Sequence, residues 1–170
     1  HFHFNTANGV ISGTPGALLT RSQFTIYANN SGGTSIAYVN VTINDVAPGT
    51  FSYSPIDMDL TLNQAMTPNT VSPGGGTVTS WVISPDVPTG LNFGSSNGTI
   101  WGTPTALQTN PITYTIWANN SGGSTSTTVT ITITDIIPSI SYSLNDIIET
   151  LGVPINPHSN PTNSGGTVIS

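Results

Sequence analysis

Apolar and polar side chains alternate along two stretches of the chain, 112–118 and 125–134. The alternate apolar positions in these stretches are Ile112, Tyr114, Ile116, Ala118, Val129, Ile131 and Ile133. Most of the residues between them are threonine. Because successive side chains of a strand point to opposite faces, the pattern predicts an antiparallel sheet with one buried face, which includes Ile112, and one face in water.

Shorter apolar segments, separated by turn residues, predict the remaining strands. These segments are 48–55 as a first, edge-type strand, 59–62 as its continuation after a kink at Pro55, 77–83, 91–93 and 99–101. The stretch 63–76 contains two prolines and three consecutive glycines and is predicted to be a loop. No stretch with a helical period is long enough to be convincing. Six or seven short strands with turns between them predict an all-β fold, an antiparallel β-sandwich.

One eight-residue motif occurs twice. It reads Asn-Gly-Thr-Ile-Trp-Gly-Thr-Pro at 97–104 and Asn-Gly-Val-Ile-Ser-Gly-Thr-Pro at 8–15, an offset of 97 − 8 = 89. Asn-Gly closes a tight turn because both residues tolerate a positive φ. A short strand follows with Ile100 facing inward, and Gly102 and Pro104 end it. The motif contains no acid, base or metal ligand and therefore predicts architecture, not chemistry.

Other segments repeat in phase with this motif. The pairs are 24–33 with 114–123, 39–45 with 129–135, 51–54 with 140–143, and 75–78 with 165–168, at offsets of 89 or 90. A fixed period of this length predicts tandem copies of one Ig-like or cadherin-like sandwich module of about 90 residues.

The positions at which the repeated segments fall along the sequence divide the chain into three predicted parts. Residues 48–137 form a complete module, residues 1–47 the back part of a preceding one, and residues 138–170 the front part of a following one. Either the chain is a piece of a longer repetitive protein, or 138–170 of one chain completes 1–47 of the next in a head-to-tail fibre. Such a composite would lack a counterpart of 81–89. The short, proline-bearing joints predict a semi-rigid string.

Charge and cysteine content exclude several classes of protein. Charged residues make up 5% of the chain, against roughly 25% in an average globular protein. Arg21 is the one basic residue, and the net charge is −6. We therefore expect no nucleic-acid partner and no attraction to anionic lipid. Cysteine is absent, which excludes a disulfide scaffold. No apolar run approaches the roughly 20 residues of a membrane helix, so we expect no membrane insertion in this segment.

The order of three segments, 88–93, 97–105 and 114–123, resembles the putative-Ig repeat of large bacterial and archaeal surface proteins. That family is grouped with dystroglycan-type, cadherin-like domains. The resemblance covers the middle module and both partial ones. It implies an Ig/cadherin-like sandwich in an extracellular or cell-surface adhesin, stalk or fibre, and it supplies no catalytic residues.

Four aspartates are candidate calcium ligands. Asp45 and Asp135 lie at the module joints, and Asp57 and Asp59 would share one face of an extended segment. Calcium takes about six oxygen ligands, several of them carboxylate. The alternative is that these residues are solvated turn residues and caps. We expect no other cofactor.

Three aromatic side chains, Trp101, Trp117 and Tyr27, are predicted to point outward. Tyr27 is the counterpart of Trp117. Outward aromatics can stack on sugar rings or contact neighbouring modules. The alternative is partial cover by loops of the same module.

Four Asn-x-Ser/Thr sequences are candidate glycosylation sites: Asn29, Asn40, Asn97 and Asn119. Asn29 and Asn119 occupy the same hairpin turn in successive modules and are the best of the four. Bulky glycans would also help to keep so uncharged a chain in solution.

Two functions remain open, and neither is enzymatic, because the chain shows no nucleophile–base constellation and no carboxylate pair in a pocket. The first is a structural module of an extracellular filament, stalk or adhesin. It would act by stacking and self-association with copies of the chain or adjacent repeats, including strand exchange between chains. The second is a glycan- or receptor-binding adhesion module that uses Trp101, Trp117 and the Asn-Asn-Ser-Gly-Gly turns.

Overall fold

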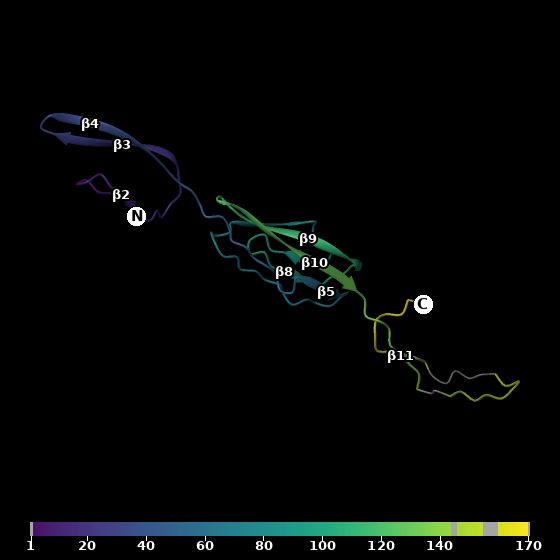
Figure 1. Ribbon diagram of the computed structural model, residues 1–170. Helices are drawn as coiled ribbons and strands as arrows, with labels where there is room; N and C mark the ends of the chain where they lie inside the picture. The colour runs from purple at the N-terminus through teal and green to yellow at the C-terminus, as the bar shows by residue number, and fades with distance from the viewer. Residues whose placement is uncertain (1, 144–145, 155–159, 170) are drawn as a thin grey trace.

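The computed structural model describes residues 2–143, 146–154 and 160–169. Every regular element in this part of the chain is a strand, which confirms the predicted all-β fold. None of the described residues belongs to a helix that could cross a membrane. The chain runs as three parts along one line: a pair of N-terminal hairpins, a central sandwich and an extended C-terminal segment (Figure 1).

The central sandwich is built on one sheet, in which the strands lie in the order β5 (Asp57–Thr61), β10 (Gly123–Thr134), β9 (Gln108–Asn120) and β6 (Ser80–Ser84). β9 and β10 form the predicted antiparallel hairpin, with Val129 opposite Tyr114, and β6 is antiparallel to β9. β5 is parallel to β10, with Met58 opposite Ile131. The antiparallel pairing predicted for 112–118 with 125–134 is therefore confirmed, and β5 is the parallel exception, because residues 62–122, which include the β7–β8 region of the other layer, separate β5 from β10 in place of a tight turn.

The second layer faces this sheet and is centred on the hairpin of β7 (Leu91–Phe93) and β8 (Ile100–Gly102). The stretch 63–71 runs beside β8, where the backbones of Asn69 and Ile100 exchange hydrogen bonds of 2.9 and 3.0 Å. The predicted edge strand over 48–55 does not form, apart from an isolated bridge between Pro48 and Gly75. Pro48 and Pro55, at the two ends of that segment, lack the amide donors that a ladder needs.

The hydrophobic core lies between the two layers. Its buried members are Tyr53, Met58, Trp81, Leu91, Ile100, Tyr114, Ile116, Ala118, Val129, Ile131 and Ile133. The motif residue Ile100 and the alternating residues of β9 and β10 therefore point inward, as the sequence pattern predicts.

Ile112 departs from that pattern, since its side chain is 40% exposed. It lies opposite the buried Ile131, but β6 pairs only with residues 115–119 of β9 and leaves this end of the strand uncovered. The β-bulge of this hairpin lies between Gln108 and Ile112, and the Gln108 side chain makes two hydrogen bonds beside it. Its Nε2 donates to the Ile131 carbonyl at 2.7 Å, and its Oε1 accepts from the Tyr114 hydroxyl at 3.0 Å.

The N-terminal part contains two hairpins, formed by β1 (Phe2–Phe4) with β2 (Ile11–Gly13) and by β3 (Leu19–Asn30) with β4 (Gly33–Ile43). Their registers match those of the central module. Phe2 lies opposite Gly13 as Leu91 lies opposite Gly102, at an offset of 91 − 2 = 89.

The second N-terminal hairpin matches at a different offset. Phe24 lies opposite Val39 as Tyr114 lies opposite Val129, at 114 − 24 = 90. The offset changes because the bulge of β9 holds one residue more than the bulge of β3.

The C-terminal part contains the short pair β11 (Ile140–Ser141) and β12 (Thr162–Asn163). One of its turns repeats a turn of the central module: the amide of Val153 donates to the Thr150 carbonyl as Gln64 donates to Thr61. The positive φ of 84° at Gly152 likewise matches the 59° at Asn63, at an offset of 152 − 63 = 89. Residues 150–153 thus keep the local conformation of 61–64.

Candidate functional site

The linker between β4 and the central sandwich, residues 45–48, is bound by side chains from far along the chain. We call this segment the joint. The Asn120 side chain lies at its centre: Nδ2 donates to the Val46 carbonyl at 2.7 Å and to the Thr77 carbonyl at 3.1 Å. Oδ1 of the same amide accepts from the amides of Gly122 and Gly123 at 2.8 and 3.1 Å. Asn120 therefore fastens the β9–β10 turn to the preceding linker.

Two hydroxyls add to this clamp. The Ser121 hydroxyl donates to Asp45 Oδ2 at 2.6 Å, and the Thr125 hydroxyl donates to the Pro48 carbonyl at 2.6 Å. The other carboxylate oxygen of Asp45 accepts from the amide of Val46 at 2.9 Å. The carboxylate of Asp45 thus serves as a cap for the linker.

Glycines let the backbones at the joint approach closely. A Cβ at Gly122 would lie 2.7 Å from the Asp45 carbonyl oxygen, and one at Gly76 would overlap the Val46 carbonyl. The backbone also bonds here: Gly49 donates to Gly74 at 2.6 Å, and Gly76 donates to Ala47 at 3.0 Å. A side chain at Gly76 or Gly122 would force the linker out of place.

The second linker, residues 135–138, makes the same backbone contacts with the glycines that follow it in the chain. The amide of Gly166 donates to the Ile137 carbonyl at 3.2 Å, and a Cβ at Gly166 would meet the Ile136 carbonyl. Asp135 Oδ1 accepts from the amide of Ile136 at 2.8 Å, as Asp45 does from Val46. The repeated Gly-Gly-Thr-Val sequences are therefore parts of the joints.

The four candidate calcium ligands do not form a cluster. Asp45 and Asp135 cap their own linkers, and Asp57 and Asp59 are exposed on β5 on either side of the buried Met58. Within the described residues, no group of three or more histidines, cysteines, aspartates or glutamates could hold a metal ion. Calcium binding stays a prediction that requires another source of oxygen ligands.

Calcium removal gives a direct test of that prediction. Because the Asp45 carboxylate is occupied by Ser121 and Val46, we expect the melting temperature to be the same with 1 mM calcium and with excess chelator. Circular dichroism at 218 nm is a suitable measurement. A midpoint that rises by several degrees with calcium would show that the aspartates bind the ion.

The candidate aromatic residues do not share a surface. Trp101 is 39% exposed on β8 in the second layer, whereas Trp117 is half-buried on β9, between the inward-pointing Ile116 and Ala118. The two indoles therefore lie on opposite outer faces of the sandwich. Tyr27, on β3, is 61% exposed. A flat sugar-binding platform within one module would have only one of the two tryptophans.

The four candidate glycosylation sites differ in exposure. Asn29, Asn40 and Asn97 are exposed, and Asn119 is half-buried beside β6. Asn97 Oδ1 accepts from the amide of Thr99 at 3.0 Å, and Asn29 Oδ1 accepts from the Thr34 hydroxyl at 2.8 Å. Among the described residues, no side-chain hydrogen bond of this kind is seen for Asn40 or for Asn119.

Sequence reasoning missed two functional groups of residues. The first is the clamp of Asn120 and Ser121, whose signal was the repeated Asn-Asn-Ser-Gly-Gly turn. The second is the pair of aromatic residues that contact the Asn-Gly turn: Trp81 packs on Gly98, and the Tyr53 hydroxyl donates to the Gly98 carbonyl. Burial raises the pKa of the Tyr53 hydroxyl far above its ordinary value, so Tyr53 stays a neutral donor.

Two facing layers, a buried apolar core and a clamped linker define an immunoglobulin-like β-sandwich module. The family model described as Putative Ig domain matches residues 48–134, which is 134 − 48 + 1 = 87 of the 170 residues. The chain belongs to this family. A search of curated proteins finds no match to the chain.

Removal of the Asn120 side chain is expected to loosen the joint. Asn120→Ala deletes two donor bonds and two acceptor bonds, and we expect cleavage at Asp45 by an aspartate-specific endoproteinase to become about tenfold faster. Mass spectrometry of timed digests measures the rate.

The matched control is Asn30→Ala, at an offset of 120 − 30 = 90. Asn30 Oδ1 accepts from the amide of Gly32 at 2.8 Å, as Asn120 accepts from Gly122, but its turn lies at the far end of the N-terminal hairpin. Cleavage at Asp45 should be unchanged in Asn30→Ala. Equal cleavage rates in wild type and Asn120→Ala would contradict the clamp.

Proposed function

We propose that this chain is a structural module of an extracellular filament, stalk or adhesin, and that its work is to hold shape and distance. Membership in an immunoglobulin-like family supports a structural or adhesion role. The single observation that carries the proposal is the joint, in which Asn120, Ser121 and Thr125 bind the linker that enters the module. A linker held by these bonds fixes the orientation of one module relative to the next.

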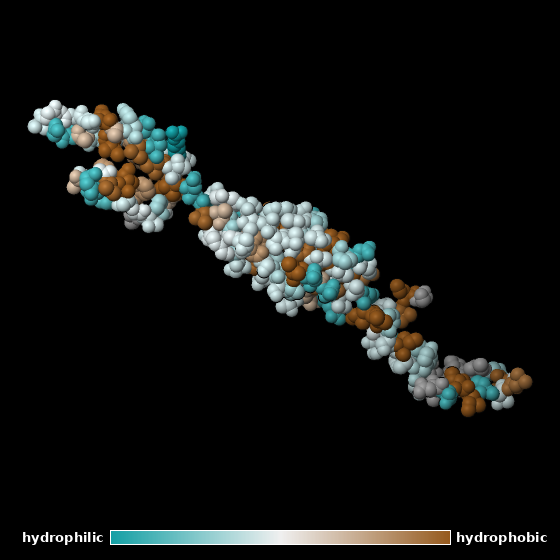
Figure 2. Space-filling model, viewed as in Figure 1, coloured by the Kyte–Doolittle hydropathy of each residue, from teal (hydrophilic) through white to brown (hydrophobic). Residues whose placement is uncertain are grey.

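The arrangement of the chain supports a spacer in particular. The three parts follow one another along a line and do not fold back on one another (Figure 1). The surface of the central sandwich is mostly of intermediate hydropathy, with strongly apolar residues gathered at the two ends of the molecule (Figure 2). Contacts between copies or adjacent repeats would therefore form end to end. We expect no enzymatic activity from this arrangement.

The chemistry of the surface agrees with an extracellular or cell-surface setting. With a net charge of −6 and charged residues at 5%, solubility depends on threonine, serine and asparagine. Glycans at the exposed Asn29, Asn40 or Asn97 would add to it. The alternative function, glycan or receptor binding through exposed aromatics, has to rely on Trp101 or Trp117 separately.

Electron microscopy of negatively stained chains tests the proposal against this alternative. Straight rods, or fibres with an axial spacing near a whole number of modules, would support a spacer. Single particles that bind a sugar array, and lose that binding on Trp117→Ala but not on Tyr27→Ala, would favour the adhesion module and overturn the proposal.

A further inference from the structure

The chain enters the central sandwich at one end and leaves it at the other. The joint lies at the end nearest β4, and β10 points toward the C-terminal part, along the line on which the three parts of the chain lie (Figure 1). A pull between the two ends of the chain therefore passes through the sandwich, from Pro48 to Thr134. The strands that receive this load are β5, the first of the sandwich, and β10, the last.

These two strands are neighbours in the sheet and run parallel. A pull on the N-terminal side draws β5 toward its own start, and a pull on the C-terminal side draws β10 toward its own end. Because the strands are parallel, the two displacements are opposite and lie along the strand axis, so the ladder is loaded in shear. All of its hydrogen bonds then carry the force together. In an antiparallel pair the two pulled ends would coincide, and the bonds would break one at a time.

We propose that the central sandwich bears tension along the chain, and that the parallel ladder of β5 and β10 is the part that resists it. The inference rests on the proposed function, to which it adds the load that the spacer withstands. The ladder extends from the pair Asp57 and Thr130 to the pair Thr61 and Thr134. β10 is also held on its other side by β9, so β5, at the edge of the sheet, is the strand that separates first.

Hydrogen bonds close the ladder at both ends. The amide of Thr130 donates to the Ile56 carbonyl at 2.9 Å, and the amide of Leu62 donates to the Thr134 carbonyl at 2.8 Å. Alternate residues of a strand direct their amides to the same neighbour. The amide of Leu60 therefore also faces β10, whereas the amide next to it in the chain faces away.

The side chains of β5 prevent the ladder from slipping under load. Met58 is 2% exposed and lies opposite Ile131, whereas Asp57 and Asp59 on either side of it are exposed. A slip of one residue would turn both carboxylates toward the apolar core. The strand must therefore move by two residues, about 7 Å, before its side chains fit again. Asp57 and Asp59 need no metal ion for this role.

The load reaches β5 through residues 48–56, which contact both layers of the sandwich. The Thr125 hydroxyl of β10 donates to the Pro48 carbonyl at 2.6 Å, and the Tyr53 hydroxyl donates to the Gly98 carbonyl in the other layer. Tyr53 is 3% exposed, so drawing this segment out of the module also exposes core surface to water. These contacts share the load with the ladder.

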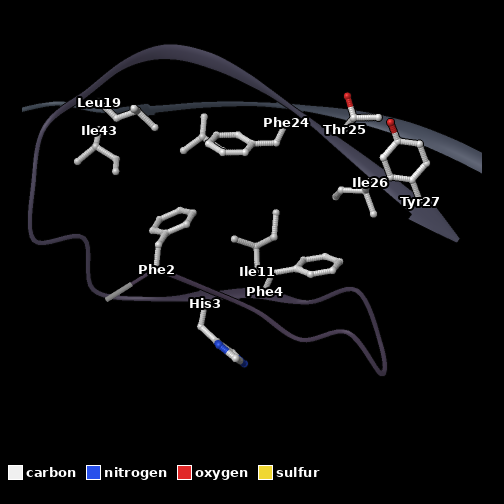
Figure 3. A pocket seen from close by; sticks show the side chains of 11 residues that line it. Phe2, His3, Phe4, Ile11, Leu19, Phe24, Thr25, Ile26, Tyr27 and Ile43 are labelled. Carbon is white, nitrogen blue, oxygen red and sulfur yellow. The ribbon is translucent and has the colours of Figure 1, made fainter.

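The β3–β4 hairpin of the same chain has the opposite geometry. Its strands are antiparallel, and Leu19 lies opposite Ile43, where the chain enters and leaves the hairpin. A pull along the chain therefore peels this hairpin open from one end. Its apolar side chains face those of the first hairpin across a groove of about 590 Å³, which is open in a chain of these 170 residues (Figure 3). The hairpin should therefore open at low force.

Optical tweezers attached to the two ends of the full chain test the inference. The hairpin should open first and release a contour length of about 8 nm, from 43 − 19 = 24 residues. The sandwich should then rupture in one step that releases about 27 nm, from 134 − 57 = 77 residues. We expect its rupture force to be about twofold or more that of the hairpin.

A second pair of attachment points in the same sandwich is the matched control. Gln64→Cys and Ile137→Cys place single cysteines at exposed positions just beyond the same end of β5 and β10, in a chain without other cysteines. A pull between them peels the ladder from Leu62 onward, and the rupture force should fall to about half or less. Attachment of the same double variant at its chain ends should restore the high force.

Two proline variants test the ladder at neighbouring residues. Leu60→Pro removes an amide that faces β10, whereas Asp59→Pro removes one that faces away, where an edge strand tolerates proline. The rupture force between the chain ends should fall in Leu60→Pro and stay unchanged in Asp59→Pro. Melting curves check that each variant is folded, and the comparison of pulling directions uses a chain without either proline.

The outcomes separate this inference from the proposed function. A sandwich that ruptures at the same force in both directions, or two proline variants with the same effect, would overturn the load-bearing ladder. Neither result affects the spacer, because the rigidity of the joint is measured without force in the dilute monomer. A flexible joint beside a sandwich with a high rupture force would overturn the proposed function and leave the ladder in place.

Discussion

Gly98→Ala is expected to destabilise the central sandwich by about 2–5 kcal/mol, the sum of left-handed backbone strain and overpacking. Gly98 has a φ of 70°, and a Cβ there would lie 2.8 to 3.0 Å from three atoms of the Trp81 ring. That ring also contacts Phe51 edge to face, with centroids 5.1 Å apart, so it has little room to move. Urea denaturation followed by tryptophan fluorescence measures the change.

Gly9→Ala is the matched control for this substitution. Gly9 has a φ of 72° in the same motif, but no atom lies within 4 Å of the added Cβ. The change introduces only local strain in the first hairpin, and the unfolding midpoint of the central sandwich should not move. If both alanine variants unfolded at the wild-type midpoint, the seating of Trp81 on the Asn-Gly turn would be refuted.

Ile116→Ala should cost about 2–5 kcal/mol of unfolding free energy, the range found for large-to-small substitutions in a packed core. Ile116 is fully buried between the sheet and the β7–β8 hairpin. The tight packing on both sides leaves a cavity that the neighbouring strands cannot close. Differential scanning calorimetry at low protein concentration would record the loss.

Its counterpart Ile26→Ala, at 116 − 26 = 90, should leave the central transition unchanged. Ile26 is half-buried on the wall of the open groove and outside the central core. Equal losses at the two positions would mean that the N-terminal hairpins and the central sandwich unfold as one unit.

Local signals account for most of what the sequence predicts correctly. Alternation along 112–118 and 125–134 specifies which side chains of a strand face inward, and Asn97-Gly98 specifies a tight turn. Both properties depend on residues that are neighbours in the chain. The β9–β10 hairpin, the β7–β8 hairpin and the burial of Ile100 follow from them.

The features that sequence reasoning missed depend on residues far apart. Asn120 and Val46 are 120 − 46 = 74 residues apart, and nothing near either of them indicates the bond. The parallel pairing of β5 with β10 and the uncovered position of Ile112 depend on which strand lies alongside. The Asn-x-Ser sequence at Asn119 predicts an exposed glycan site, but Asn119 is half-buried and the residue beside it, Asn120, fastens the joint.

A distance distribution across the joint tests the central claim most directly. Spin labels on Gln23→Cys in β3 and Thr128→Cys in β10 lie on exposed positions on either side of the joint, in a chain without other cysteines. Double electron–electron resonance on the dilute monomer should give one narrow distance, which broadens on Asn120→Ala. A broad distribution in the wild type, unchanged by Asn120→Ala, would contradict a module built to hold shape and distance.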